Sequence, residues 1–386
     1  MRTRLTSIAL LVAALVAPAV AQDRPTLKIG VSTRLSGPSA VIGDSDRKSI
    51  TMALDELNAA GGVAGFRLEA VYADNKGVPS EAVAVARRLA DVDQVLAIVD
   101  SAGSSGTLAV MPVIQQLGLV NLAKSSTNPR LYGMSGKGGN EWAFRINIDD
   151  TMIARSYAAF VAQRAKSLAV LAYNDDFGRG AVKAYEPIFK ELNVRVTGTE
   201  FFARGVADYR PLLTRLRQDS PEGILYIATA GDSAIFARQL REVGWKVPVF
   251  TRSDIASPEF LRAIQDDPSL AEGWTDATLW TPDVDAAFVK RYEERWSSAA
   301  VTHGALGYHA VKAVLAPAIA RAAADGGGKV TRQGLRDALA KIDVQTPIGA
   351  IRFDEHNQAY PNLFIVQIQG GKTRVLSAVS VARGTP

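Results

Sequence analysis

Short apolar runs alternate with segments of helical periodicity over most of this chain, and this alternation constrains the fold more than any other feature. Residues 26–32 and 95–99 have the character of buried strands. Between them, apolar side chains recur at i, i+3, i+4 and i+7, as they do from residue 50 to residue 57. Parallel strands covered by helices on both faces give this pattern, so the sequence predicts a doubly wound α/β layer with right-handed crossovers.

The same alternation begins again after a glycine-rich segment at 132–140. Further strands are expected at 168–173, 194–201, 224–228 and 247–251. Three long helices and two late strands then follow, at 284–296, 305–324, 331–340, 351–353 and 363–368. The chain is long enough for more than one core. The sequence therefore predicts two α/β lobes of similar size, an arrangement that hinged binding proteins have.

The first 21 residues predict an export signal. Arg2 and Arg4 form a basic start, residues 8–16 form a short apolar run, and Ala19-Val20-Ala21 has the small-x-small pattern of a signal peptidase site. The apolar run is shorter than the roughly twenty residues that a membrane span needs. We therefore expect cleavage after Ala21 and a soluble protein in the periplasm.

Composition excludes several classes of chemistry. The chain has no cysteine and three histidines, which excludes disulfides, thiolate metal sites and a cysteine nucleophile. The formal net charge of +5 becomes smaller once Arg2 and Arg4 leave with the signal, so nucleic acid is not an expected partner. No G-x-S-x-G elbow, Walker loop or dinucleotide fingerprint is present. We expect neither an enzyme nor a bound metal or cofactor.

Hydroxyl side chains gather where two neighbouring strands are expected to end. The strand at 95–99 leads into the segment 100–107 (DSAGSSGT), and the strand at 119–122 leads into 125–129 (SSTNP). Ligands of open α/β sheets bind at the carboxyl ends of the strands, and the N–H groups at a helix start favour an anionic group. Either segment alone is better explained as a helix cap, since serine and threonine are common N-cap residues. The two together indicate a cradle for a carboxylate.

A series of short motifs then runs through the chain in a fixed order. They are LSGP at 35–38, GD at 43–44, LNAAGGVAG at 57–65, ADN at 73–75, PSEA at 79–82, SSGT at 104–107, SSTNP at 125–129, DFGRG at 176–180 and the segment 349–354. In this order and spacing the chain resembles the periplasmic leucine/isoleucine/valine-binding proteins, the type I solute-binding components of ABC importers. The resemblance covers nearly all of the expected mature chain.

The resemblance implies a fold and a function. The fold is that of the type I periplasmic binding proteins: two doubly wound three-layer α/β lobes joined by a multi-strand hinge. The N-terminal lobe would comprise 27–145 plus 280–355, and the C-terminal lobe 146–279 plus 356–386. The function is that of a monomeric receptor that captures a small solute and presents it to an inner-membrane ABC permease. A sensory module that feeds a signalling partner is the alternative.

The resemblance also implies a set of ligand-binding residues. Ser104 and Thr127 would hold a carboxylate, and Ser125 would offer its carbonyl group. Thr229 stands where leucine-binding relatives carry a tyrosine. The whole set is Ile42, Ser104, Ser105, Ser125, Ser126, Thr127, Phe177, Thr229, Arg252 and Asp254.

One position departs from the family pattern. The amino-acid binders carry an acid that pairs with the ligand ammonium, but ungapped comparison puts Ser253 there, between Arg252 and Asp254. With Asp254 in the cleft, the ligand would be a branched-chain or other amino acid, which we expect. With Arg252 in the cleft, the ligand would carry a second anionic group or would lack an amine, as an aromatic or aliphatic acid does. An amide is a further alternative. Alternatively, the two side chains pair with each other at the surface.

Overall fold

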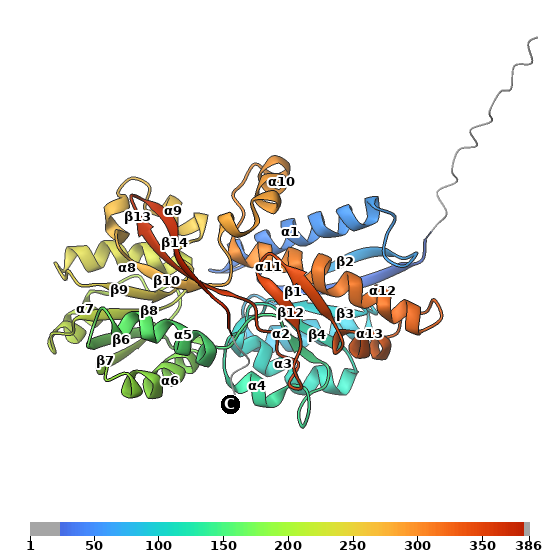
Figure 1. Ribbon diagram of the computed structural model, residues 1–386, viewed down its shortest axis with the longest axis horizontal. Coiled ribbons are helices and arrows are strands. Elements are labelled where there is room, and N and C mark those ends of the chain that lie inside the picture. The colour runs from blue at the N-terminus through green and yellow to red at the C-terminus, as the bar shows by residue number, and fades with distance from the viewer. Residues whose placement is uncertain (1–23, 382–386) are drawn as a thin grey trace, which may run out of the picture.

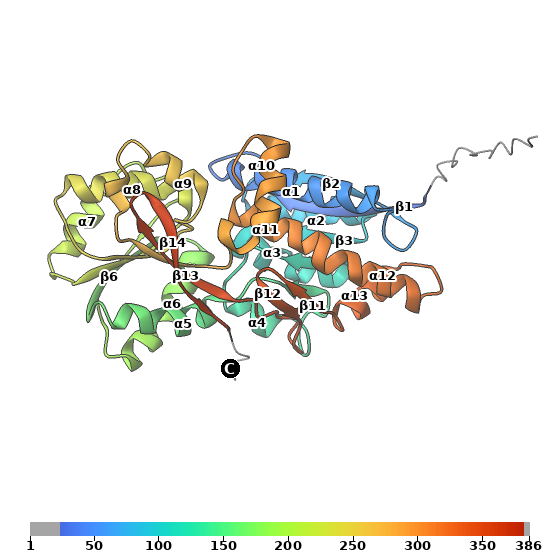
Figure 2. The ribbon, with the colours of Figure 1, turned by 45° about the horizontal axis from the view of Figure 1, so that its top comes forward.

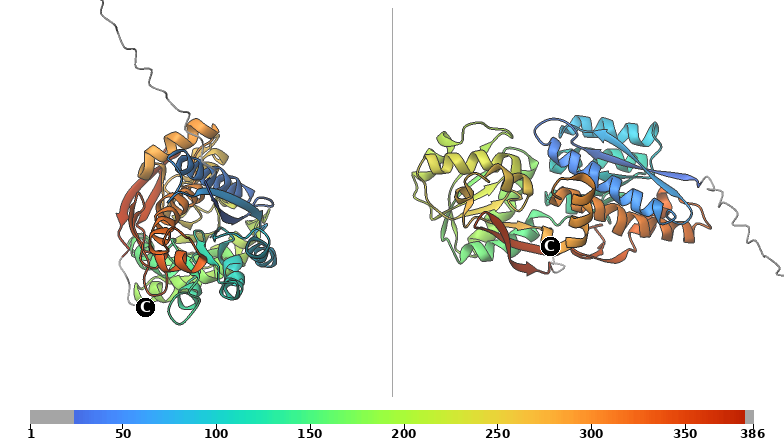
Figure 3. Two further views of the ribbon diagram at one scale, coloured as in Figure 1. Left: turned by 90° about the vertical axis from the view of Figure 1, so that its right-hand side faces the viewer. Right: turned by 90° about the horizontal axis from the view of Figure 1, so that it is seen from above.

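The computed structural model describes residues 24–381 and shows two α/β lobes lying side by side along its long axis (Figure 1, Figure 3). The export signal expected at 1–21 lies outside the described residues. Each lobe consists of a mainly parallel sheet between two layers of helices. The predicted two-lobed, doubly wound fold is therefore confirmed.

The first lobe contains a five-stranded parallel sheet. Its order is β2-β1-β3-β4-β5, with bounds Arg67–Asp74, Thr26–Thr33, Ala97–Asp100, Val120–Ala123 and Ala143–Arg145. Helices α2 and α3 pack on one face, and α1 and α11 pack together on the other. The helices of this lobe are α1 (Ala40–Ala59), α2 (Pro79–Asp91), α3 (Gly103–Leu117), α4 (Arg130–Met134), and the later α10 (Ala286–Trp296), α11 (Thr302–His309), α12 (Ala316–Asp325) and α13 (Arg332–Leu339).

The helix expected at 305–324 is interrupted. Helix α11 ends at His309, a wider π-helical segment spans Ala310–Leu315, and α12 begins at Ala316. Pro317 has no N–H group with which to continue the α-helical hydrogen bonds, which accounts for the change of register here. A hairpin of β11 (Asp343–Thr346) and β12 (Gly349–Arg352) follows α13.

The second lobe contains a seven-stranded sheet of order β14-β13-β10-β9-β8-β6-β7. Strands β6 (Ser167–Tyr173), β7 (Arg195–Phe202), β8 (Gly223–Ile227), β9 (Val249–Arg252) and β10 (Thr275–Thr278) are parallel, and β13 (Leu363–Gln369) and β14 (Lys372–Val379) are antiparallel. The helices are α5 (Asp150–Ala162), α6 (Asp176–Glu191), α7 (Arg210–Arg217), α8 (Ala230–Glu242) and α9 (Pro258–Ala263).

Three stretches of chain pass between the lobes: after β5, after β10 and before β13. Figure 2 shows the last of them, which leads from the β11–β12 hairpin into β13. Two of them are joined by backbone hydrogen bonds, because Arg145 N–H donates to the Asn357 carbonyl and Ala359 N–H donates to the Arg145 carbonyl, each at 2.9 Å. These bonds hold adjacent connections together as one hinge. The residue boundaries given above for the two lobes stay predictions. Within residues 24–381 no helix has both the length and the apolar character that a membrane span requires.

Candidate functional site

A cavity of about 140 Å³ lies between the two lobes. Residues of α1 and α11 form part of its lining. Its walls also include residues that follow the carboxyl ends of strands in both sheets: β1, β3 and β4 in the first lobe, and β7 to β10 in the second. This is the position at which open α/β sheets bind ligands, so the topology itself places the site.

Eight of the ten predicted site residues line this cavity: Ile42, Ser104, Ser125, Thr127, Phe177, Thr229, Arg252 and Asp254. Ser105 and Ser126 do not. The fully buried Ser126 hydroxyl is hydrogen-bonded to Thr107 Oγ1 within the first lobe. Ser105 Oγ accepts a 3.3 Å hydrogen bond from the N–H of Asp176 in the second lobe. Ser105 therefore joins the lobes beside the cavity.

The first hydroxyl-rich segment forms the start of α3, and its hydroxyls do not cap that helix. The N-cap residue is Ala102, whose methyl side chain cannot accept a hydrogen bond and whose N–H donates to Asp100 Oδ1 at 2.7 Å. Ser104 Oγ instead accepts from the N–H of Asn128 at 3.3 Å. Ser125 Oγ is buried and has no hydrogen-bond partner among the described residues. A buried hydroxyl without a partner is costly, so Ser125 is suited to contact a ligand.

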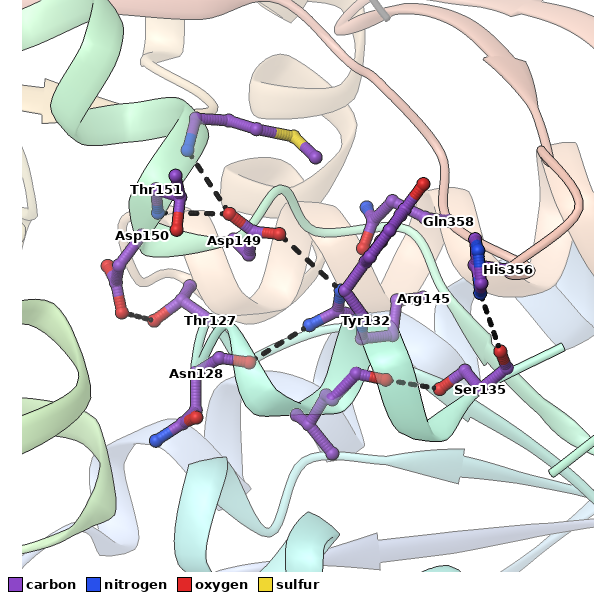
Figure 4. Close-up of polar contacts among 12 residues, drawn as sticks. Thr127, Asn128, Tyr132, Ser135, Arg145, Asp149, Asp150, Thr151, His356 and Gln358 are labelled. Carbon is purple, nitrogen blue, oxygen red and sulfur yellow. Dashed lines mark hydrogen bonds and ion pairs between the residues drawn. The ribbon is translucent and has the colours of Figure 1, made fainter. Parts of the chain in front are cut away.

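Thr127 is held by the second lobe, as Figure 4 shows. Its hydroxyl donates to Asp150 Oδ2 at 2.8 Å, at the start of α5. Asp150 also accepts from Arg252 Nη2 at 3.2 Å, and Arg252 Nη1 donates to the Ala277 carbonyl at 2.8 Å. Burial raises the pKa of Asp150 to about 6, against the lowering effects of Arg252 and Thr127. Arg252 lines the cavity, but its terminal nitrogens bond to the protein.

Asp254 also lines the cavity and does not pair with Arg252 at the surface. Its Oδ1 accepts a 2.8 Å hydrogen bond from the hydroxyl of Thr302, in α11 of the first lobe. Burial raises the pKa of Asp254 to about 6, although Thr302 and Arg252 act to lower it. The expectation that Asp254 reaches the cleft therefore agrees with its position, and its carboxyl group also links the two lobes.

Sequence reasoning missed Arg34, which directly follows β1. The side chain lines the cavity and is 7% exposed, yet it forms no hydrogen bond or ion pair with any residue from 24 to 381. Its guanidinium lies against Gly103 so closely that a Cβ there would be 2.3 Å from Nη2. Burial, and next the charge of Arg204, lower the pKa of Arg34 to about 10. A cation directly after a buried strand was the available signal.

Arg204 and His303 are two further lining residues that sequence reasoning missed. Arg204 follows β7, and its Nε and Nη2 donate to Asp175 Oδ2 at 2.8 and 2.7 Å. Its guanidinium also lies 4.0 Å from the centre of the Tyr173 ring. Burial, with the charges of Lys124 and Arg34, lowers the pKa of His303 well below its usual value, so this imidazole is neutral.

Buried ion pairs hold in place the segment that carries Ser125 and Thr127. Lys124 and Asp46 form a completely buried pair at 2.7 Å, and Lys124 also donates to the His303 carbonyl at 3.1 Å. At the hinge, Arg145 Nη1 donates to the Asn128 carbonyl at 3.2 Å and Nη2 lies 3.8 Å from Asp149 (Figure 4). These contacts fix the segment 124–128, which carries Ser125 and Thr127.

Two α/β lobes, a multi-strand hinge and a polar cavity between facing strand ends define a two-lobed solute-binding protein. Residues 26–373 match the family described as periplasmic binding protein, and the chain belongs to this family. Its members are binding proteins and not enzymes. Among residues 24–381 we find no group of three or more histidine, aspartate or glutamate side chains that could hold a metal.

The chain is similar to several characterised proteins. It is 32% identical over 221 residues to an amino acid binding protein of Pseudomonas aeruginosa. The matched residues make up 56% of this chain and 57% of the relative, so the chain spans just over half of the relative's length. It is 25% identical over 333 residues, 86% of each chain, to a leucine-, isoleucine-, valine-, threonine- and alanine-binding protein of the same organism. An ABC-transporter solute-binding protein from Rhodopseudomonas palustris, solved with 3,4-dihydroxybenzoic acid, has a TM-score of 0.82 at 18% identity, covering 93% of this chain and 98% of its own.

Proposed function

We propose that this protein is the periplasmic receptor of an ABC importer and captures a small carboxylate-bearing solute between its lobes. The observation that carries the proposal is Arg34, a buried cation in the interlobe cavity without a protein partner. An uncompensated buried charge is strongly unfavourable, so an anionic ligand at this point would stabilise the protein. The N-terminus of α3 and the free Ser125 hydroxyl favour the same charge.

An amino acid is the first candidate for the solute. Arg34 would face the carboxylate, and Asp254 would face the ammonium group. The names of the Pseudomonas relatives support this choice. The second candidate is an aromatic or aliphatic acid without an amine. One observation that supports it is the excess of arginines over acids in the cavity lining, which contains Arg34, Arg204 and Arg252 but only Asp254 and Glu259. The other is the 3,4-dihydroxybenzoic acid bound to the Rhodopseudomonas protein.

Capture would proceed by closure of the lobes about the hinge. A solute in the cavity touches both lobes only when they are together, and it therefore shifts the population toward the closed form. Hydrogen bonds already cross between the lobes beside the cavity. They run from Asn128 Nδ2 to the Asp176 carbonyl, from Asp176 N–H to Ser105, from Thr127 to Asp150, and from Thr302 to Asp254. The closed form would be recognised by an inner-membrane permease. Export by the segment 1–21 and a monomeric state complete the proposal.

Thermal-shift screening of the purified mature protein tests the proposed function. The panel contains leucine, threonine, benzoate and 3,4-dihydroxybenzoate, and titration calorimetry follows on each compound that raises the melting temperature. A ligand at a hundred times its dissociation constant adds about 2.7 kcal/mol to the free energy of unfolding. Failure of every acid in the panel to bind would contradict the proposal, and chemical turnover of a bound compound would contradict the receptor role.

The variant Asp254→Asn separates the two candidates. If the ligand is an amino acid, loss of the paired carboxylate costs about 3–5 kcal/mol, so the affinity falls by roughly two orders of magnitude or more. If the ligand has no amine, the affinity falls much less, because the Asn amide oxygen can still accept the hydrogen bond from Thr302 that links the lobes. Asp266→Asn is the control, because Asp266 is exposed and lies outside the cavity lining.

A further inference from the structure

Two arginines face the cavity from opposite lobes. Arg34 follows β1 in the first lobe, and Arg204 follows β7 in the second. Among the charges that act on Arg34, that of Arg204 has the largest effect, and it opposes the protonated form. The two guanidinium groups therefore repel each other across the cavity.

The protein does not neutralise Arg34 with its own carboxylates. The carboxylates of Asp46, Asp100 and Asp175 favour the protonated form of Arg34, but none of them forms a hydrogen bond or ion pair with it. Asp175 is paired with Arg204 at 2.7 Å. Asp46 is paired with Lys124 at 2.7 Å and accepts from Thr33 at 2.7 Å. Asp100 accepts from Ala102 N–H, from Thr107 and from Asn121 at 2.7 to 3.0 Å. All three carboxylates are already bound to other groups, so Arg34 is left with its full donor capacity.

Arg204 keeps donors toward the cavity while its position is fixed. Asp175 binds only Nε and Nη2, and the Tyr173 ring supports the plane of the guanidinium. A guanidinium has five N–H donors, so Nη1 and one N–H of Nη2 remain. A carboxylate has two oxygens and about four acceptor sites, which is enough to bind one arginine through two bonds and a second arginine through another.

We propose that the carboxylate of the solute is held between Arg34 of the first lobe and Arg204 of the second, so that the ligand's own negative charge draws the lobes together. The inference rests on the proposed function and adds to it the group that the two lobes share. Ser104, next to Gly103 at the start of α3, borders the same place from the first lobe. An uncharged isostere such as an amide would leave the two guanidinium groups opposed and would not close the cavity.

Titration calorimetry with acid and amide pairs tests this clamp in the full mature protein. The probes are leucine with leucinamide and benzoate with benzamide, and the pair whose acid binds the wild type is used. We expect the acid to bind at least ten-fold more tightly than its amide. Arg34→Gln and Arg204→Gln should each weaken acid binding by ten-fold or more and remove most of the acid preference. Arg34→Lys, which keeps the charge but loses the planar fork, should fall between wild type and Arg34→Gln.

Arg179→Gln is the matched control. Arg179 is an exposed arginine of the second lobe that donates to Asn174 and lies over the Phe201 ring, outside the cavity lining. Thermal melts of each variant without ligand establish that it is folded. If Arg204→Gln binds the acid as the wild type does, the two-lobe clamp is wrong even when Arg34→Gln is impaired. Equal binding of acid and amide by the wild type would also overturn the two-lobe clamp, but it would leave the receptor function intact. A wild type that binds neither acid would instead overturn the proposed function.

Discussion

Thr302 and Asp254 join the two lobes directly: the Thr302 hydroxyl in α11 donates to the carboxyl group of Asp254, two residues after β9, with 2.8 Å between Oγ1 and Oδ1. Because this bond exists only when the lobes are together, it contributes to closure and hence to ligand affinity. A hydrogen bond to a charged group contributes about 1.5–3 kcal/mol. We expect Thr302→Val to weaken binding by roughly ten-fold or more, as measured by calorimetry.

The pH dependence of this effect has a definite sign. The pKa of Asp254 is raised to about 6, chiefly by burial, so the carboxyl group is ionised at pH 8 and largely neutral at pH 5. The bond from Thr302 is charge-assisted only in the ionised form. The ratio of the variant's Kd to that of the wild type should therefore be larger at pH 8 than at pH 5. Thr214→Val in α7, where the hydroxyl donates to the Arg210 carbonyl, serves as the control and should leave both values unchanged.

Ser125 and Thr127 should respond differently to truncation. Ser125→Ala removes a hydroxyl that has no partner among the described residues, so the melting temperature should not fall, while ligand affinity should fall by about 1.5–3 kcal/mol if the hydroxyl binds a charged group. Thr127→Ala removes the donor to Asp150 and should lower the melting temperature as well. A loss of stability in Ser125→Ala without any loss of affinity would contradict this assignment.

Lys124 should be essential for stability. Lys124→Met leaves the Asp46 carboxylate buried without its partner, which typically costs about 3–5 kcal/mol in the free energy of unfolding. Urea denaturation of the unliganded protein measures this loss. Lys48→Met is the control, because Lys48 and Asp44 form an ion pair at 2.7 Å near the surface, and such pairs contribute at most about 1 kcal/mol. Similar losses in the two variants would contradict the prediction.

Asp276 should make the protein less stable as the pH rises. Burial raises the pKa of this carboxyl to about 7, whereas the ordinary value is 3.8. Between these two values the folded state binds more protons than the unfolded state, so the contribution of Asp276 to the free energy of unfolding falls through this window. The side chain in Asp276→Asn does not titrate. The free energy of unfolding of the wild type, relative to that of the variant, should therefore fall from pH 4 to pH 8. Asp266→Asn, at an exposed position, should show no such trend.

Export gives a prediction that depends on the sequence alone. Arg2 and Arg4, the apolar run at 8–16 and the site at Ala19-Val20-Ala21 predict a mature protein that begins at Gln22. Intact-mass spectrometry of protein released from the periplasm by osmotic shock measures this end. A mass that retains Met1 would contradict the assignment.

Strands whose sequence pattern is weak were the part of the fold that sequence reasoning missed. Strand β10 has the sequence TDAT, in which a buried aspartate stands where an apolar residue is expected. The Asp276 carboxylate is accommodated because the N–H groups of Ile255 and Ala277 donate to it at 3.0 and 2.8 Å. Strand β14 lies at a sheet edge with most of its side chains at least partly exposed, so it lacks a clear apolar pattern. Tertiary contacts stabilise both.

The sequence by itself determined the alternation of strands and helices, because period-2 and period-3.6 burial is a local property of the chain. It also determined that Ser104, Ser125 and Thr127 follow strands, and in parallel sheets strand ends define the binding edge. Only the tertiary structure decided how these groups are used. Thr127 and Arg252 meet at Asp150, and Arg34 is left without a partner while Arg252 is not. Pairing of charges depends on which distant segments pack within hydrogen-bonding distance, and neither composition nor local periodicity encodes that distance.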